Sequence, residues 1–217
     1  MSSDDSRAAS DLGLAGDGSV AGCELVRDPD VGELLAHALA DDPDRAFENV
    51  VRTYQDRIVS YLVRYLGDSG RAEEVAQDVF VRAYRALKTY DAARIRSLRL
   101  RSWLYAIASN LARNAVRGKR LSLVGLEHDN GRPRALADRS PSPQERAELR
   151  EDWQRLGEAI ERLSPKLRGA FVLRYVEELS YDEIAEALAQ PVGTVKASAH
   201  RGLLAVRASV KEAGEAG

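Results

Sequence analysis

The chain of 217 residues is predicted to be an all-α protein with two helical domains joined by a flexible linker. In two long stretches, apolar residues recur every three or four positions, as on the buried side of amphipathic helices. Between residues 121 and 148 that period disappears, and glycine and proline, which break helices, become frequent. The length leaves room for one or two domains with cores, and a hydrophobic content of 44% with many Ala, Leu and Arg residues predicts a mostly helical, soluble chain.

Residues 1–42 are expected to form an acidic, largely disordered N-terminal extension with one short helix at Val31–Ala40. This segment holds ten acidic residues against Arg7 and Arg27, and small polar residues dominate its first part. Such a composition buries too little apolar surface to fold by itself. Two roles stay open for it: a solvated tail, or a segment that folds back on a basic tract and weakens nucleic-acid binding.

Residues 43–120 are predicted to form a bundle of three amphipathic helices. The pair Asp42-Pro43 is a helix-start signal, with aspartate as the cap and proline in the first turn. The apolar periods then give helices from Pro43 to the Gly67–Gly70 turn, at about Arg71–Lys88 and at about Ser97–Arg120. These helices are long enough to share one core.

A linker at residues 121–148 is expected to lead into a smaller helical domain at residues 149–213. Ser164-Pro165 begins one helix there, and Ser180 with Glu183 forms a capping box at the start of another. Pro191 and Gly193 mark a tight turn before the last helix. Val195, Ala199 and Leu203 form the buried stripe of that last helix.

The segment Leu179–Arg207 therefore reads as a helix-turn-helix, a motif whose second helix enters the DNA major groove. No acidic residue lies between Ala187 and Lys211. Basic side chains on the outer face can contact phosphates or guanine edges. The plainer alternative is a solvated basic helix in an ordinary bundle. The outer face of the second helix carries Thr194, Lys196, Ala197, Ser198, His200 and Arg201.

A second basic tract lies in the first domain, although the net charge of the chain is only −2. No acidic residue occurs from Ala92 to Leu126, a stretch with eight basic ones. Such local concentrations of positive charge are typical of nucleic-acid contacts. Within this tract Asn110, Arg113, Asn114 and Arg117 share one face of a helix. Trp103 could stack on bases, but its place on the apolar stripe favours core packing.

Several other classes of function are disfavoured by the sequence. Cys23 is the only cysteine and the three histidines are scattered, so neither a disulfide nor a metal site is expected. No glycine-rich phosphate loop or nucleophile–base pair indicates an enzyme, and no catalytic residue or cofactor is predicted. The chain has neither a signal peptide nor an apolar run of membrane-spanning length, so a cytoplasmic protein without membrane association is expected.

Four motifs, in this order and spacing, resemble the bacterial sigma factors of the extracytoplasmic-function group, which keep only the second and fourth sigma domains. They are Leu66–Leu87, Ser102–Arg120, Leu163–Leu188 and Gly193–Leu203. A one-component regulator, with a ligand-binding domain fused to a helix-turn-helix, is the main competing interpretation. That interpretation leaves the second basic tract unexplained.

The resemblance implies a dissociable subunit that binds core RNA polymerase and promoter DNA and helps to melt the DNA. Glu74, Gln77 and Asp78 match family positions that dock on the β′ clamp helices, and Arg82 lies on a neighbouring turn; the plainer alternative is a solvated helix face. The second domain would meet the β flap. The minus-ten contacts would be Arg96, Arg99, Asn110, Arg113, Asn114 and Arg117. The six outer residues of the helix-turn-helix would read the minus-thirty-five element. The family commonly uses an anti-sigma factor that binds between the two domains, so one is a candidate partner here.

Two segments depart from the family pattern. The loop Thr89–Trp103 is about four residues longer than the usual family loop, lacks its glycine and carries four arginines. The sequence therefore does not predict which promoter base this loop recognises. In the last helix, Ala197 and Ser198 replace a serine and an arginine, and Gly202 stands mid-helix at a cost of about 1 kcal/mol relative to alanine. A non-standard minus-thirty-five sequence, or weaker dependence on that element, is predicted.

Overall fold

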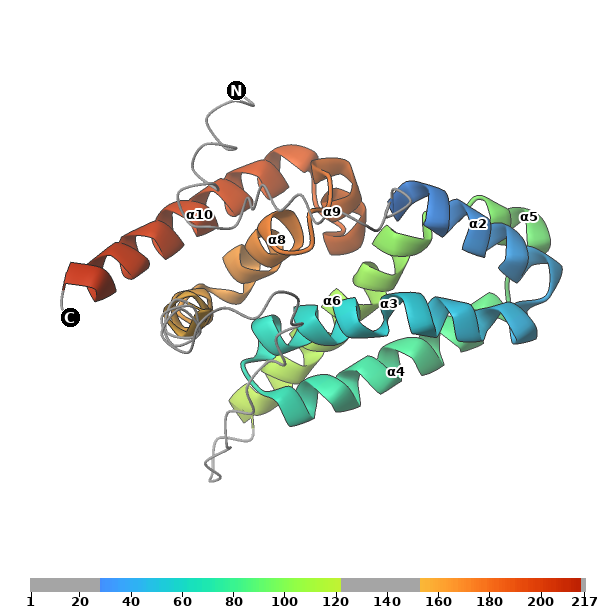
Figure 1. The fold of residues 1–217 in the computed structure, drawn as a ribbon, viewed down its shortest axis with the longest axis horizontal. Coiled ribbons are helices and arrows are strands. Elements are labelled where there is room, and N and C mark those ends of the chain that lie inside the picture. The colour runs from blue at the N-terminus through green and yellow to red at the C-terminus, as the bar shows by residue number, and fades with distance from the viewer. Residues whose placement is uncertain (1–27, 122–152, 216–217) are drawn as a thin grey trace, which may run out of the picture.

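The computed structural model describes residues 28–121 and 153–215, and within these ranges every regular element is a helix (Figure 1). The first domain consists of α2 (Asp28–Asp41), α3 (Pro43–Leu66), α4 (Ser69–Leu87), α5 (Ala92–Arg96) and α6 (Leu100–Leu121). The second consists of a helix over 153–161, α8 (Pro165–Tyr175), α9 (Tyr181–Leu188) and α10 (Val192–Glu215). The all-α, two-domain prediction is confirmed. The predicted linker lies outside the described residues apart from Leu121.

The bundle of the first domain is built on an α3–α4 hairpin against which α6 packs (Figure 1). Asp42 caps α3 by accepting a hydrogen bond from the backbone N–H of Arg45 at 3.1 Å, and Pro43 occupies the first turn. Gly67 ends α3 at φ 71°, a left-handed conformation that glycine adopts without a Cβ clash. Asp68 then caps α4 through the N–H of Arg71 at 2.9 Å. The start and stop signals in the sequence thus form the hairpin.

The first domain also contains α2, from the segment that was predicted to be a mostly disordered extension. The helix expected at Val31–Ala40 runs from Asp28 to Asp41 and packs against α3, α5 and α6. Its Ala36 and Leu39 are fully buried, so these residues belong to the core of the first domain. Residues 1–27 lie outside the described part of the chain.

The predicted third helix, Ser97–Arg120, is shorter at its start than expected. The long loop before it folds into the separate helix α5, capped by Asp91 through the N–H of Arg94 at 2.7 Å. Ile95 anchors α5 in the core with 2% exposure, and α6 begins at Leu100. A single buried isoleucine among arginines gives no visible apolar period, which is why the sequence suggested only a loop.

In the second domain, α9 and α10 form the predicted helix pair. The capping box is confirmed: Ser180 Oγ accepts from the N–H of Glu183 at 3.2 Å, and Glu183 Oε2 accepts from the N–H of Ser180 at 2.8 Å. The left-handed residue of the turn is Ala189. Gly193 is already inside α10, which begins one residue earlier than it. α8 begins at Pro165 as expected, without a side-chain cap bond from Ser164.

Gly202 has a packing role that the sequence did not indicate. A Cβ added to it would lie 3.0 Å from Cβ of Phe171 and 3.4 Å from the carbonyl oxygen of Leu167, both on α8. Glycine therefore lets α10 approach α8 closely, and this contact offsets its low helix propensity.

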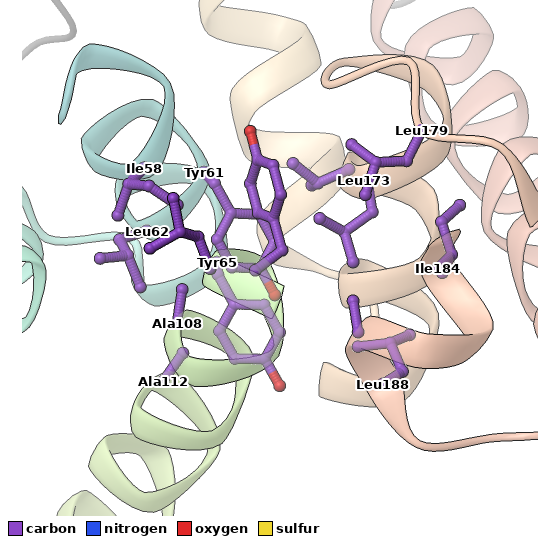
Figure 2. Packing of buried hydrophobic residues seen from close by; sticks show 14 of the residues in the cluster. Ile58, Tyr61, Leu62, Tyr65, Ala108, Ala112, Leu173, Leu179, Ile184 and Leu188 are labelled. Carbon is purple, nitrogen blue, oxygen red and sulfur yellow. The ribbon is translucent and has the colours of Figure 1, made fainter. Parts of the chain in front are cut away.

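The two domains share one continuous hydrophobic core (Figure 2). At the junction α3 packs against α8 and α6 packs against α9. A Cβ on Gly169 of α8 would lie 3.2 Å from the ring of Tyr65 on α3, so glycine permits this close approach. Arg168 Nη1 donates to the carbonyl of Tyr65 at 2.6 Å. Figure 2 shows the two sides of the junction: Ile58, Tyr61, Leu62, Tyr65, Ala108 and Ala112 face Leu173, Leu179, Ile184 and Leu188.

Candidate nucleic-acid interface

A polar stripe on α6 is the clearest candidate surface for nucleic acid. Asn110, Asn114 and Arg117 are exposed, whereas Arg113 is half-buried. Arg113 donates through Nη2 to Asn110 Oδ1 at 2.6 Å and through Nε to the carbonyl of Ser109 at 3.2 Å. The structure therefore brings the four predicted residues together, with the guanidinium of Arg113 held along the helix. Their spacing of three and four residues places them on one face, opposite buried Ala108 and Ala112.

Arg96 and Arg99, the other predicted minus-ten residues, are exposed but already paired with carboxylates of the chain itself. Arg96 Nη2 lies 2.9 Å from Asp41 Oδ1 of α2. Arg99 Nη1 lies 2.5 Å from Glu186 Oε1 of α9, and this hydrogen bond raises the pKa of Arg99. Both guanidinium groups, which were expected to contact DNA phosphates, are thus paired with carboxylates of the chain itself.

Trp103 is half-buried and packs against the core, in agreement with the interpretation that favoured packing over stacking. Its ring centroid is 6.3 Å from that of Tyr90 at an interplanar angle of 57°. The guanidinium carbon of Arg94 lies 3.7 Å from the Tyr90 centroid, within the range of a cation–π contact. These contacts fix the α5 segment against the start of α6.

On α10 the predicted DNA-facing set needs one correction. Lys196, Ala197, His200 and Arg201 are exposed and Thr194 is half-buried, but Ser198 is fully buried. Three residues after Val195 and four before Gly202, Ser198 falls on the side that packs inward. The sequence reasoning counted a polar residue as outward-facing, although a run of eight consecutive helix residues must also cross the buried side.

The predicted polymerase-docking residues form an exposed face of α4. Glu74, Gln77, Asp78 and Arg82 are all exposed. They follow one another at three, one and four residues, which places them on one side of the helix. The opposite side of α4 is buried in the bundle through Ala72, Ala76, Val79, Ala83 and Leu87.

Sequence reasoning missed a group of polar residues at the junction of the domains. Tyr105 of α6 donates to Glu177 Oε2 at 2.6 Å, and Ser102 donates to Glu186 Oε2 at 2.8 Å. Glu177 is only 4% exposed, and burial raises its pKa, although the bond from Tyr105 and the nearby Arg64 oppose the shift. No local pattern could reveal these pairs, because their partners are 72 and 84 residues apart in the sequence.

Comparison with known proteins gives the family. Residues 50–121 match the model of sigma-70 region 2, and residues 153–206 match that of sigma-70 region 4. The chain is 34% identical to the ECF RNA polymerase sigma factor SigW of Bacillus subtilis, over 77% of this chain and 90% of that protein. The chain belongs to the ECF sigma factors of the sigma-70 family. This sigma factor is also 38% identical to the RNA polymerase sigma-H factor of Pseudomonas aeruginosa, over 72% of this chain and 82% of the other.

The sigma factor also shares its fold with a solved relative. The sigma factor RpoE of Bartonella quintana, solved in complex with the anti-sigma factor NepR, matches with a TM-score of 0.58 and 19% identity, over 76% of this chain and 96% of that one. The chain is thus an alternative sigma factor that directs promoter-specific initiation of transcription with core RNA polymerase. Its family is not one of catalytic enzymes. Within the described ranges, none of the helices is long and apolar enough to span a bilayer.

Proposed function

We propose that the first domain, at residues 43–120, reads the minus-ten element and docks on polymerase, and that the second, at residues 149–213, reads the minus-thirty-five element. The exposed asparagine and arginine stripe of α6 carries this proposal. Arginine binds phosphates, and the asparagine amide can pair with base edges. The two ends of the stripe, Asn110 and Arg117, are both exposed, so a strand could contact its whole length.

The exposed face of α4 is the proposed contact with the β′ clamp helices of the polymerase. Its mixed charges, two carboxylates and one guanidinium around Gln77, suit orientation and recognition more than raw affinity. We further propose that the second domain meets the β flap, which would hold α10 over the upstream promoter. An anti-sigma factor is a candidate partner, since RpoE of Bartonella quintana was solved with one.

On α10 the proposed minus-thirty-five surface is Thr194, Lys196, Ala197, His200 and Arg201, without the buried Ser198. Lys196 Nζ lies 5.5 Å from the ring centroid of Tyr181, and Arg201 Nε donates to the carbonyl of Ala197 at 3.1 Å. Only two cations and one imidazole remain on this surface. That supports a non-standard minus-thirty-five sequence or weak dependence on it.

In the proposed role the sigma factor catalyses no reaction itself. It acts in the cytoplasm, where bacterial RNA polymerase transcribes the chromosome. Reconstitution with purified core polymerase and a promoter library tests this. Specific transcripts that appear only when the chain is added are expected, with selection concentrated in the minus-ten region. Tight binding to duplex DNA without polymerase, and no transcripts, would instead indicate a one-component regulator.

A further inference from the structure

The side chain of Arg113 does not extend from α6 toward solvent but lies back along the helix. Its Nε donates to the backbone carbonyl of Ser109 at 3.2 Å, and its Nη2 donates to Oδ1 of Asn110 at 2.6 Å. Arg113 is half-buried, whereas Asn110 is exposed. Two acceptors on the preceding turn therefore hold one planar guanidinium group, an arrangement that the ammonium group of a lysine cannot reproduce with the same geometry.

The backbone beneath this guanidinium group is held by the core of the first domain. Ser109 is fully buried, and its hydroxyl shares a 2.8 Å hydrogen bond with the hydroxyl of Tyr61 on α3. Tyr61 is itself fully buried. The carbonyl of Ser109 therefore has a fixed position, because a side chain of a neighbouring helix holds this residue in addition to the α6 backbone. Arg113 is thus attached to a rigid point and not to another mobile surface group.

The next pair on the polar stripe of α6 has the same spacing but lacks this arrangement. Asn114 and Arg117 are also three residues apart, and both are exposed. Within the part of the chain that the structure describes, no hydrogen bond joins these two side chains. The spacing alone therefore does not produce the contact, which depends on the half-buried stem of Arg113 and the fixed carbonyl of Ser109. Arg117 can instead extend toward a phosphate group.

The contact with Arg113 determines which way the amide group of Asn110 faces. A guanidinium group carries only hydrogen-bond donors, so the amide atom beside it must be the carbonyl oxygen and not the nitrogen. The nitrogen Nδ2 lies on the other branch of the amide group and faces away from Arg113 at the exposed surface. Among the described residues it has no hydrogen-bond partner. Asn110 therefore presents an N–H donor to a molecule that binds α6.

An outward N–H donor distinguishes DNA bases by the group that they carry at one position of the base edge. Thymine and guanine carry keto oxygens there, O4 and O6, which accept a hydrogen bond, whereas cytosine and adenine carry amino groups, which donate one. A donor on the protein favours the keto bases, since an amino group would place two donors face to face. An asparagine whose amide can turn behaves differently, because it pairs with adenine through both amide atoms.

We propose that Arg113 is a positioning residue, which orients Asn110 as the reader of one keto base, thymine or guanine, in the minus-ten element. The inference rests on the proposed reading of that element by α6. It divides the polar stripe by role: Arg113 holds the amide group, Asn110 reads the base, and Arg117 contacts phosphate. The base preference at this one promoter position is then set by a hydrogen bond within the protein, between Arg113 and Asn110.

Exchange of the outward donor for an acceptor tests the orientation of Asn110. Asn110→Asp keeps an oxygen for Arg113 but places a second oxygen where Nδ2 was, so the preference should change from keto to amino bases by about two- to tenfold. Transcription by the full-length chain with core polymerase, on a promoter library randomised in the minus-ten element, measures this. Asn114→Asp adds the same charge one turn away and should not change the preference at that position. The proposal is overturned if no position changes from keto to amino bases, or if the unsubstituted chain prefers adenine there.

The positioning role of Arg113 is tested by two substitutions that keep the positive charge. Arg113→Lys loses the planar group that joins Ser109 and Asn110, so the preference for keto bases should fall by about two- to tenfold. Arg117→Lys should leave that preference unchanged, because an ammonium group also binds phosphate. Equal binding of both variants to core polymerase checks that the fold is kept. An equal loss of base preference in the two variants would overturn the positioning role. If the unsubstituted chain shows no selection in the minus-ten element, the proposed function itself is wrong.

Discussion

The two proposed DNA-reading helices, α6 and α10, differ in the spacing of the polar residues that the sequence predicts for their outer faces. On α6 the four predicted residues recur at the helical period, and the structure places them on one face. On α10 the predicted set was nearly a continuous run, and Ser198 within it is buried. The difference shows that spacing carries more information about a helix surface than polarity does, since a short hydroxyl can be accommodated inside.

The largest expected effect is the loss of an α6 contact. Asn114→Ala removes an exposed amide from the centre of the stripe, and a specific base contact is worth about 1–3 kcal/mol, or about 5- to 150-fold. Promoter-specific transcription should fall within that range, while binding to core polymerase is unchanged. Arg52→Ala, in an exposed pair with Glu48 on α3, serves as the control. A loss of less than twofold for Asn114→Ala would remove α6 from its proposed role.

Gly202→Ala should give the next largest effect and sharpens the comparison at α10. The added methyl group would meet the Cβ of Phe171 at 3.0 Å, and this atom is fixed to the α8 backbone. Overpacking of this kind costs about 1–3 kcal/mol, against about 1 kcal/mol gained in helix propensity. A net loss of stability of up to about 2 kcal/mol is expected in denaturant unfolding.

Gly157→Ala provides the control for this substitution. No atom lies within 4 Å of a Cβ at that helical position. The helix propensity of alanine should therefore stabilise the chain by about 0.5–1 kcal/mol. If Gly202→Ala stabilises the protein as much as Gly157→Ala does, the close approach of α8 and α10 is not what selects glycine.

The two domains pack against each other through α6 and not through α10. The packing at α6 should therefore depend on pH, because it includes the buried carboxyl group of Glu177. Burial raises the pKa of Glu177 above 4.5, and the charged groups facing it are Arg57, Arg64 and Arg101, with Tyr105 as hydrogen-bond donor. When the two domains separate, the Glu177 carboxyl group is exposed to water and its pKa is lower. The form in which the two domains are packed together therefore binds a proton on Glu177 more tightly than the separated form does.

The packing of the two domains against each other should consequently become more stable as pH falls from neutral toward 5. This stabilisation is lost as pH rises through the raised pKa of Glu177. A pair of fluorophores on the two domains should report more efficient energy transfer at the lower pH. Glu177→Gln, which can still accept from Tyr105, should abolish the pH dependence without opening the protein. A dependence that persists in this variant would assign the titration to another group.

How far the sequence predicts this molecule depends on the range of each interaction. Caps such as Asp42 and the Ser180 box are local, and the structure has them where expected. Amphipathic periods gave α3, α4 and α6 because each buries its own stripe. The helix α5 and the role of Gly202 could not be predicted, because both depend on neighbours elsewhere in the chain. The pairing of Glu177 with Tyr105 is similar, since charge alone marks Glu177 as a surface residue.

The smallest expected effect comes from Ser198→Ala, which tests the α10 side of the comparison directly. The Ser198 hydroxyl is fully buried and has no hydrogen-bond partner among the described residues. Removing an unsatisfied buried polar group is neutral or stabilises by up to about 1 kcal/mol. Arg201→Ala, one turn away on the exposed side, should weaken binding to minus-thirty-five DNA and leave stability unchanged. If instead Ser198→Ala alters promoter choice as much as Arg201→Ala does, α10 must rotate when it binds DNA, and the exposed set read from its present packing is wrong.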